Sequence, residues 1–305
     1  MWRQLATRTL AGAAIVTALS LVNGSAAQVW GQPPGPDNGA QLTVVMPQAP
    51  APTLPEAPTA PFEGLEARTR QASADAARSG ATTEIVVLDR TTGQIVSNGV
   101  SQQVPIASVV KLFIADDLLL QESQGQTQLT PADHQQLDLM LRSSDDGAAQ
   151  TFWDRSGGNA IITRVVARYG LRGTTPPYNG HWDVTLSTAG DLVRYYSMLL
   201  DGSGGLPLDQ ANVILSNLAQ STPTGTDGYP QRFGIPDGLY AEAVAVKQGW
   251  FCCWNGPNQL HLSTGVIGPD RRYVMAISSL EPDDDAASRN TMTQVVKTMF
   301  PGGQI

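Results

Sequence analysis

Lysine, histidine and cysteine are scarce in this chain of 305 residues, which has a formal net charge of −8. The two cysteines, Cys252 and Cys253, are adjacent and cannot form the disulfide framework of a small secreted domain. Together with the three histidines they show no metal-ligand spacing, so we expect no metal site and no cofactor. The histidines are His134, His181 and His261.

The lysines number only three: Lys111, Lys247 and Lys297. A valine precedes each of them, where a phosphate-binding P-loop requires glycine, so the sequence excludes that motif. Nucleic-acid binders neutralise phosphates with clustered basic residues, and this acidic chain has no such cluster. We therefore expect no nucleic-acid partner.

The first 27 residues have the features of a secretory signal peptide. Arg3 and Arg8 give a positive start, Ala13–Val22 forms a short apolar core, and small residues end at Ala27. An uncleaved membrane anchor is the alternative, although the apolar core is short for spanning a bilayer. No cysteine follows the core, so we expect no lipid-modified N-terminal cysteine. The sequence predicts cleavage near Ala27 and a secreted, periplasmic or cell-envelope protein.

Residues 28–61 are rich in proline, with nine of the 21 prolines of the chain between positions 33 and 61. Proline at this density favours an extended tether, so we interpret the segment as a linker. It could associate with the cell wall, or it could be recognised by a groove in a partner. Residues 62–305 are long enough for one large domain.

The sequence has helical patterns at both ends of this domain and in its middle. The strand patterns lie between the terminal helices and the middle helices, on both sides. This order predicts an α/β (α+β type) fold, in which an antiparallel sheet is flanked by N- and C-terminal helices and carries an inserted all-α lobe. We expect the α/β lobe over 62–107 and 201–305, and the helical lobe over 108–200. The expected strands are 84–89, 94–97, 241–247, 261–267 and 273–279, and the expected helices are 62–79, 105–120, 130–141, 145–153, 159–169, 187–200 and 284–299.

Lys111 lies in a helix that is apolar on almost every side and is therefore predicted to be buried. Buried lysine is rare because desolvating an ammonium group is costly. Ser108 precedes it by three residues, which places both side chains on one face of the helix. A neutral amine beside a serine hydroxyl can take its proton and make a nucleophile. The alternative is that Ser108 only caps the helix.

Two further segments carry matching chemistry. Ser144, followed by Asp145 and Asp146, stands between two predicted helices, where a hydroxyl could relay a proton to a leaving group. One or both aspartates could instead stabilise the start of the second helix. Lys247, followed by Gln248 and Gly249, ends a predicted strand, where an ammonium could bind a substrate carboxylate, although it could also be an ordinary strand-edge lysine.

The order Ser-x-x-Lys, Ser-Asp-Asp, Lys-Gln-Gly resembles the penicillin-recognising serine enzymes, which are the class A β-lactamases and the penicillin-binding DD-peptidases. The resemblance extends over about residues 80–300. It implies an α/β lobe with an antiparallel sheet, an all-α lobe and an active-site cleft between them. It also implies a β-lactam or a peptidoglycan-like peptide as the small substrate, and we expect a monomer.

The resemblance assigns roles to individual residues. Ser108 would be the acylated nucleophile, Lys111 its base or proton shuttle, and Ser144 the donor of a proton to the leaving nitrogen. Lys247 would hold the substrate carboxylate, and the backbone N–H groups of Ser108 and Trp250 would form the oxyanion hole. The substrate-binding positions implied in this way are Asp146, Lys247, Gln248, Gly249 and Trp250.

The sequence also departs from that family. Asp146 replaces an asparagine, and a carboxylate near Lys111 would favour the charged amine and repel an anionic ligand. Gln248 replaces a serine or threonine whose hydroxyl helps to bind the carboxylate. The glutamate with which class A β-lactamases deacylate has no counterpart, because no Glu occurs between Glu122 and Glu242.

These observations predict an exported serine acyl-enzyme hydrolase with slow deacylation. The alternative is a catalytically degenerate relative that binds wall peptide or a protein partner at the same place. An unrelated esterase is less favoured because the Gly-x-Ser-x-Gly elbow is missing. For Cys252 and Cys253, packed free thiols and a vicinal disulfide at the rim of the site both remain open.

Overall fold

The computed structural model describes residues 62–305. The predicted signal peptide (1–27) and linker (28–61) lie outside the described residues. Among the helices of residues 62–305, none has the length and apolarity needed to cross a membrane.

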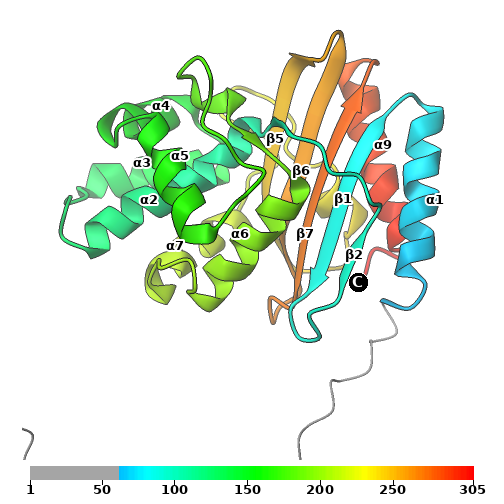
Figure 1. The fold of residues 1–305 in the computed structure, drawn as a ribbon, viewed down its shortest axis with the longest axis horizontal. Helices are drawn as coiled ribbons and strands as arrows, with labels where there is room; N and C mark the ends of the chain where they lie inside the picture. The colour runs from blue at the N-terminus through cyan, green and yellow to red at the C-terminus, as the bar shows by residue number, and fades with distance from the viewer. Residues whose placement is uncertain (1–61) are drawn as a thin grey trace, which may run out of the picture. The chain divides into compact units, whose positions relative to one another are not determined.

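An antiparallel sheet of five strands, in the order β2-β1-β7-β6-β5, is the centre of residues 62–305 (Figure 1). Strands β1 and β2, at one edge of the sheet, form the predicted hairpin, in which Val87 pairs with Val96 and Gly93 takes a positive φ of 74° in the turn. The strands are β1 (Thr82–Asp89), β2 (Ile95–Ser97), β5 (Val244–Trp254), β6 (Asn258–Ile267) and β7 (Tyr273–Glu281), and a separate short pair is β3 (Val104–Pro105) with β4 (Leu186–Ser187).

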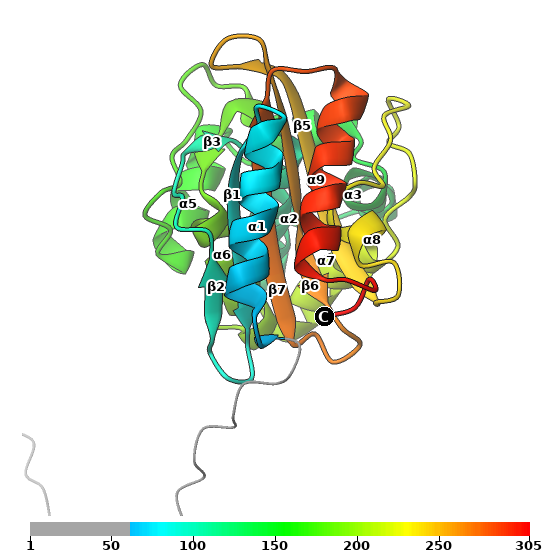
Figure 2. The ribbon, with the colours of Figure 1, turned by 90° about the vertical axis from the view of Figure 1, so that its right-hand side faces the viewer.

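Helices from the two ends of this domain cover one face of the sheet, as Figure 2 shows. They are α1 (Leu65–Arg78) and α9 (Asp285–Met299), with the short α8 (Ile235–Gly238) beside them. Their apolar side chains pack with those of the sheet into one core, which includes Leu65, Ile277 and Val296. The predicted terminal helices are therefore confirmed.

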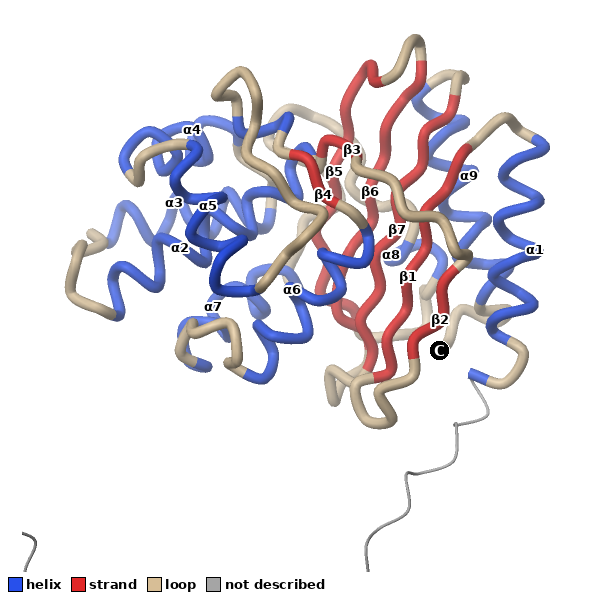
Figure 3. Tube along the Cα trace, in the orientation of Figure 1, coloured by secondary structure: helices blue, strands red, loops and turns tan. Residues whose placement is uncertain are grey.

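The remaining helices lie on the other face of the sheet (Figure 3). The chain reaches them through the 3-10 helix η2 (Ala107–Val110), and α2 is buried over its first nine residues, as expected for an apolar helix at the centre of a lobe. The helices are α2 (Lys111–Ser123), α3 (Pro131–Arg142), α4 (Asp146–Arg155), α5 (Asn159–Tyr169), α6 (Ala189–Asp201) and α7 (Leu208–Ala219), with the 3-10 helix η3 (Trp182–Val184).

The mixed α/β class with an antiparallel sheet is confirmed, but several elements differ from the sequence prediction. The helix expected over 105–120 begins only at Lys111, because Val104 and Pro105 pair with β4 and the positive φ of Ala107 separates them from the helical turns. Helix α7 was not predicted, and its apolar residues share a core with α2, beyond the lobe boundary expected at residue 200. Strand β5 continues to Trp254 although its pattern of β-branched residues ends at Lys247. Backbone pairing with β6 continues to Trp254 and extends the strand, because the length of a strand depends on its neighbour as well as on residue propensity.

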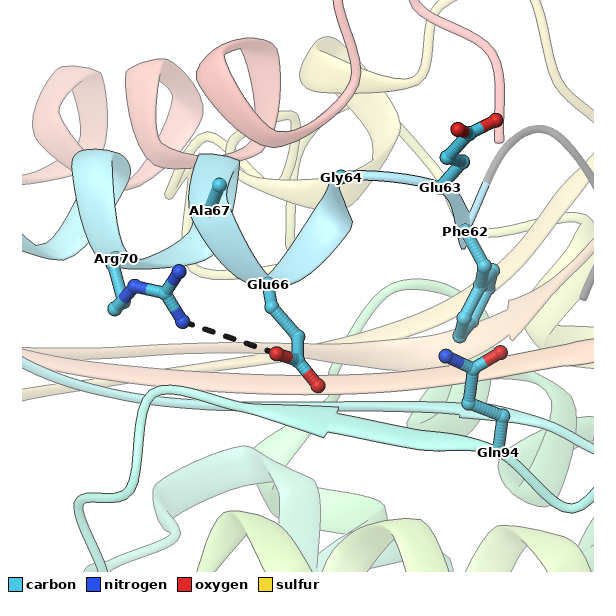
Figure 4. A pocket seen from close by; sticks show the side chains of 7 residues that line it. All are labelled: Phe62, Glu63, Gly64, Glu66, Ala67, Arg70 and Gln94. Carbon is cyan, nitrogen blue, oxygen red and sulfur yellow. Dashed lines mark ion pairs between the residues drawn. The ribbon is translucent and has the colours of Figure 1, made fainter.

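A hollow lies beside the start of α1, between that helix and the turn that precedes β2 (Figure 4). Phe62 forms one wall and stacks on Tyr273 at 5.5 Å between ring centroids.

Glu66 and Arg70 form a surface ion pair at 3.9 Å, with side chains 67% and 69% exposed. An exposed pair of this kind contributes little to stability.

A buried ion pair joins α2 to α5. Asp116 is fully buried and accepts hydrogen bonds from Arg168 and from the hydroxyl of Tyr169. Arg168 also donates to the carbonyl of Gly204 at 2.8 Å. Burial raises the pKa of Asp116, which the nearby guanidinium opposes. The pair therefore depends on both partners.

We expect Arg168→Met to lower the free energy of unfolding by about 3–5 kcal/mol, because it leaves the Asp116 carboxylate buried without its cation. The matched control is Arg70→Met, which breaks the exposed pair and should change stability by less than about 0.5 kcal/mol. Urea denaturation of both variants measures the difference. Equal, small changes in the two variants would contradict a structural role for the buried pair.

Candidate active site

Ser108 lies in η2, directly before Lys111 opens α2, and the two side chains meet as their spacing predicts. Lys111 Nζ is 2.9 Å from Ser108 Oγ. Ala107 precedes the serine with a φ of +45°, a left-handed conformation that costs a non-glycine residue about 1–2 kcal/mol. Such strain is typical of functional sites, where the surrounding fold maintains it.

Ser144 lies between α3 and α4 and faces the same lysine. Its φ of +56° turns both its carbonyl and its hydroxyl toward Lys111 Nζ, at 2.6 Å and 3.1 Å. Asp145 caps α4 by accepting a hydrogen bond from the N–H of Ala148 at 2.7 Å, which confirms the helix-start role expected for one of the two aspartates. Asp146 instead binds Lys111 Nζ through Oδ1 at 2.6 Å.

Strand β5 brings the second lysine to this cluster. Lys247 Nζ is 2.8 Å from Ser144 Oγ, so Ser144 links the two lysines. Ser108, Lys111, Ser144 and Lys247 are all buried and come from η2, α2, the loop before α4, and β5. Three motifs that are far apart in the sequence therefore form one continuous hydrogen-bonded network.

The two residues after Lys247 act differently from what the resemblance implied. Gln248 does not present its amide to the network: Nε2 donates to the carbonyl of Phe233 at 2.6 Å, and Oε1 is buried without a partner. Gly249 lies against the chain itself, because a Cβ there would be 2.7 Å from the carbonyl oxygen of Ile106. The glycine thus lets β5 pack against η2, a constraint that no single-sequence pattern reveals.

The structure adds neighbours that sequence reasoning missed. The ring of Trp182, in η3, lies 4.9 Å from Lys111 Nζ and helps to bury it. Asp227 stands on the loop between α7 and α8, and its negative charge opposes the lowering of the pKa that burial causes at both Lys111 and Lys247. Neither residue belongs to a motif, since Asp227 lies in an ordinary Thr-Asp-Gly turn, so folding alone reveals them.

Burial governs the two lysines. It lowers the pKa of Lys111, and the adjacent Asp146 carboxylate partly opposes this. Burial lowers the pKa of Lys247 well below its usual value, and the positive charge of Lys111 adds to this effect. The network thus favours the loss of a proton from at least one of the two amines, which is what a general base at a serine requires.

Four oxygen atoms surround Lys111 Nζ, which is more than the three N–H donors of an ammonium group, or the two N–H donors and one lone pair of a neutral amine, can bind at once. A neutral amine can donate to the Ser144 carbonyl and to Asp146 while its lone pair accepts the hydroxyl proton of Ser108. The arrangement can therefore support proton transfer from a serine nucleophile.

Cys252 and Cys253 form a vicinal disulfide near the end of β5, which decides between the two alternatives left by the sequence. Trp250, two residues earlier, stacks on Tyr229 with 4.2 Å between the ring centroids. Across residues 62–305, no group of three or more His, Cys, Asp or Glu side chains is placed to hold a metal ion.

We expect Asp146→Asn to lower the pKa of Lys111 further, because it removes the carboxylate that favours the charged amine. The pKa is measured by following the lysine side-chain NMR signals with pH, which is practical because the chain has only three lysines. Lys247→Arg and Lys297→Arg assign the signals, and Asp209→Asn, an exposed aspartate at the start of α7, is the matched control. An unchanged Lys111 titration in Asp146→Asn would show that the 2.6 Å contact has no electrostatic effect.

Comparison with known proteins finds relatives at two levels. No protein-family model matches the sequence. Proteins named "Putative lipoprotein LppW" from Mycobacterium tuberculosis and Mycobacterium bovis are 63% identical over 262 residues, which cover 86% of this chain and 82% of each relative.

Solved structures match at lower identity. A PBP-A variant in an acyl-enzyme complex with penicillin G matches with a TM-score of 0.63 at 19% identity, covering 80% of this chain and 97% of that one. A β-lactamase from Chitinophaga pinensis matches with a TM-score of 0.61 at 15% identity, covering 76% and 98%. These likenesses confirm the predicted fold. The chain belongs to the family of the mycobacterial LppW proteins and has the fold of the class A β-lactamases and PBP-A.

Proposed function

We propose that the protein is an exported serine acyl-enzyme hydrolase of the β-lactamase and DD-peptidase type, acting on β-lactams or cell-wall D-alanyl peptides. One observation carries the proposal: Ser108 Oγ lies 2.9 Å from a fully buried lysine amine that also reaches Ser144. The fold it shares with a penicillin-acylated PBP-A variant supports the same chemistry.

The reaction begins at Ser108. Its Oγ attacks the carbonyl carbon of the substrate while the hydroxyl proton passes to the neutral Nζ of Lys111. The backbone N–H groups of Ser108 and Trp250 would stabilise the negative charge that develops on the carbonyl oxygen. Proton transfer to a positioned base contributes about 10²–10⁴-fold to such a step.

Ser144 then carries the proton onward. Its Oγ lies 3.1 Å from Lys111 Nζ and accepts a hydrogen bond from Lys247 at 2.8 Å, which leaves its own proton free to donate. The leaving nitrogen takes that proton, the carbon–nitrogen bond breaks, and Ser144 regains a proton from Lys111. The product is an ester on Ser108.

Hydrolysis of the ester should be slow. Class A β-lactamases use a glutamate at this stage, and the stretch from Gly173 to Ser187 contains only one acid, Asp183. Asp183 has no hydrogen bond to Ser108, Lys111 or Ser144. We therefore propose an acyl-enzyme that accumulates.

A second candidate is a degenerate relative that binds wall peptide or a protein partner. It is favoured by the 2.6 Å contact between Asp146 and Lys111, because a carboxylate at this distance favours a protonated lysine that cannot accept the serine proton. The two candidates differ in one respect that can be measured, the formation of a covalent bond at Ser108.

Export to the cell envelope is part of the proposal. The lipoprotein name of the relatives agrees with an envelope location, and a disulfide is stable in oxidising compartments outside the cytosol. The two cysteines of the sequence are bonded to each other, so neither is free to carry a lipid anchor. We therefore propose that the proline-rich linker makes the contact with the cell wall. We also propose that the protein is a monomer and acts on a small substrate.

Intact-mass spectrometry tests the proposal. We expect incubation with penicillin G, or with its methyl ester, to add the mass of one molecule to the protein and none to Ser108→Ala, because the adduct is the serine ester. Lys111→Ala should slow the addition by about 10²-fold or more, since it removes the base.

The matched control is Ser101→Ala, which removes an exposed hydroxyl outside the network and should leave the adduct unchanged. The absence of an adduct with both compounds, in protein shown to be folded by circular dichroism, would refute the enzyme and leave the binding role.

A further inference from the structure

The charges that a ligand meets at this site are negative, although the buried charges are positive. Lys111 and Lys247 are 0% and 1% exposed, whereas the side chain of Asp146 is 66% exposed and Asp227 is exposed as well. Asp145 adds a third carboxylate that acts on Lys111. Two buried amines, both with a pKa lowered by burial, thus lie close to three carboxylates, two of which are exposed.

Asp227 is held firmly in this position. The N–H of Thr226 donates to the carbonyl of Ser143 at 2.8 Å, beside the network serine. On the other side, the N–H of Tyr229 donates to Asp227 Oδ1 at 3.0 Å, and the Tyr229 ring stacks on Trp250. The loop is therefore anchored both to the Ser144 segment and to β5, and it keeps its carboxylate at the site.

The groups that would hold a substrate carboxylate are engaged elsewhere. Lys247 Nζ donates to Ser144 Oγ, and its low pKa disfavours the ammonium form that pairs with an anion. Gln248 directs its amide to the Phe233 carbonyl. Besides the positive charge of Lys111, the charges that act on Lys247 come from the Asp146 and Asp227 carboxylates.

We propose that the site takes acyl donors that carry no carboxylate next to the bond that breaks, such as an internal or amidated peptide, and favours those with a cationic group there. This inference rests on the proposed acyl-serine function. It departs from substrates with a free C-terminal carboxylate, because such a group would meet Asp146 and Asp227 before it met a charged lysine. An unfavourable charge pair of this kind disfavours binding by about tenfold.

The test uses three thioesters with the same N-acetyl-D-alanyl group and different leaving thiols. The thiols are 3-mercaptopropionate, which is anionic, 3,3-dimethylbutanethiol, which is neutral, and thiocholine, which is cationic. In each case Ser108 Oγ displaces the thiol and the acyl carbon–sulfur bond breaks. The proton of Ser108 passes to Lys111, and Ser144 donates a proton to the sulfur and regains one from Lys111. The rate of thiol release is measured and corrected by the rate with Ser108→Ala.

We expect the neutral and cationic thioesters to acylate Ser108 at least about tenfold faster than the anionic one, with the cationic fastest. Asp227→Asn should reduce this difference, because asparagine keeps the hydrogen bond to Tyr229 and removes the charge. High salt should reduce it too, since screening weakens exposed charges. Asp209→Asn, which removes an exposed charge on α7, is the matched control and should leave the preference unchanged.

Each other outcome has a defined meaning. If the anionic thioester reacts as fast as the neutral one, or if Asp227→Asn leaves the difference unchanged, the charge selection is wrong while the serine enzyme stands. If none of the three thioesters gives release that depends on Ser108, the proposed function itself fails.

Discussion

The burial of the Lys111 amine is the constraint on which the rest of the site depends. A lysine with no exposed surface is tolerated only where neighbours satisfy its hydrogen bonds, and here Ser108, Ser144 and Asp146 do so. Ser108 comes from η2, whereas Ser144 and Asp146 come from the segment that opens α4. Lys247 of β5 joins them through Ser144, so the helical lobe must pack closely against the edge of the sheet. The left-handed backbone at Ser144 and the absence of a side chain at Gly249 are the local adjustments that this packing requires.

Much of the fold could be predicted because its elements have strong local patterns. The apolar helix that contains Lys111 and the hairpin of β1 and β2 follow from periodicity and turn residues. Helix α7 was missed although Pro207 is a typical helix start and its buried residues Ala211, Ile214 and Leu218 have helical spacing. Nothing in its sequence indicates which lobe it joins. The extension of β5 through Trp254 depends on pairing with β6, which is a tertiary effect.

The candidate site could be predicted only in part, for a related reason. Ser108 and Lys111 lie three residues apart across the junction of η2 and α2, and both segments are helical turns, so their contact could be foreseen from the spacing. The direction of the Gln248 side chain and the approach of Asp227 depend on how a loop and a strand edge meet, which no motif encodes. The carboxylates are therefore the feature that distinguishes this site from the family pattern, and they decide whether Lys111 can act as a base.

The pH dependence of Ser108 acylation by an uncharged thioester tests this view of the site most directly. A neutral amine accepts the serine proton, so the rate should be high above the pKa of Lys111 and fall as the pH drops through it. In Asp146→Asn the midpoint of that fall should move to lower pH, because the carboxylate that favours the charged amine is gone. A rate that does not change with pH, or a midpoint that Asp146→Asn leaves in place, would contradict the role assigned to Lys111.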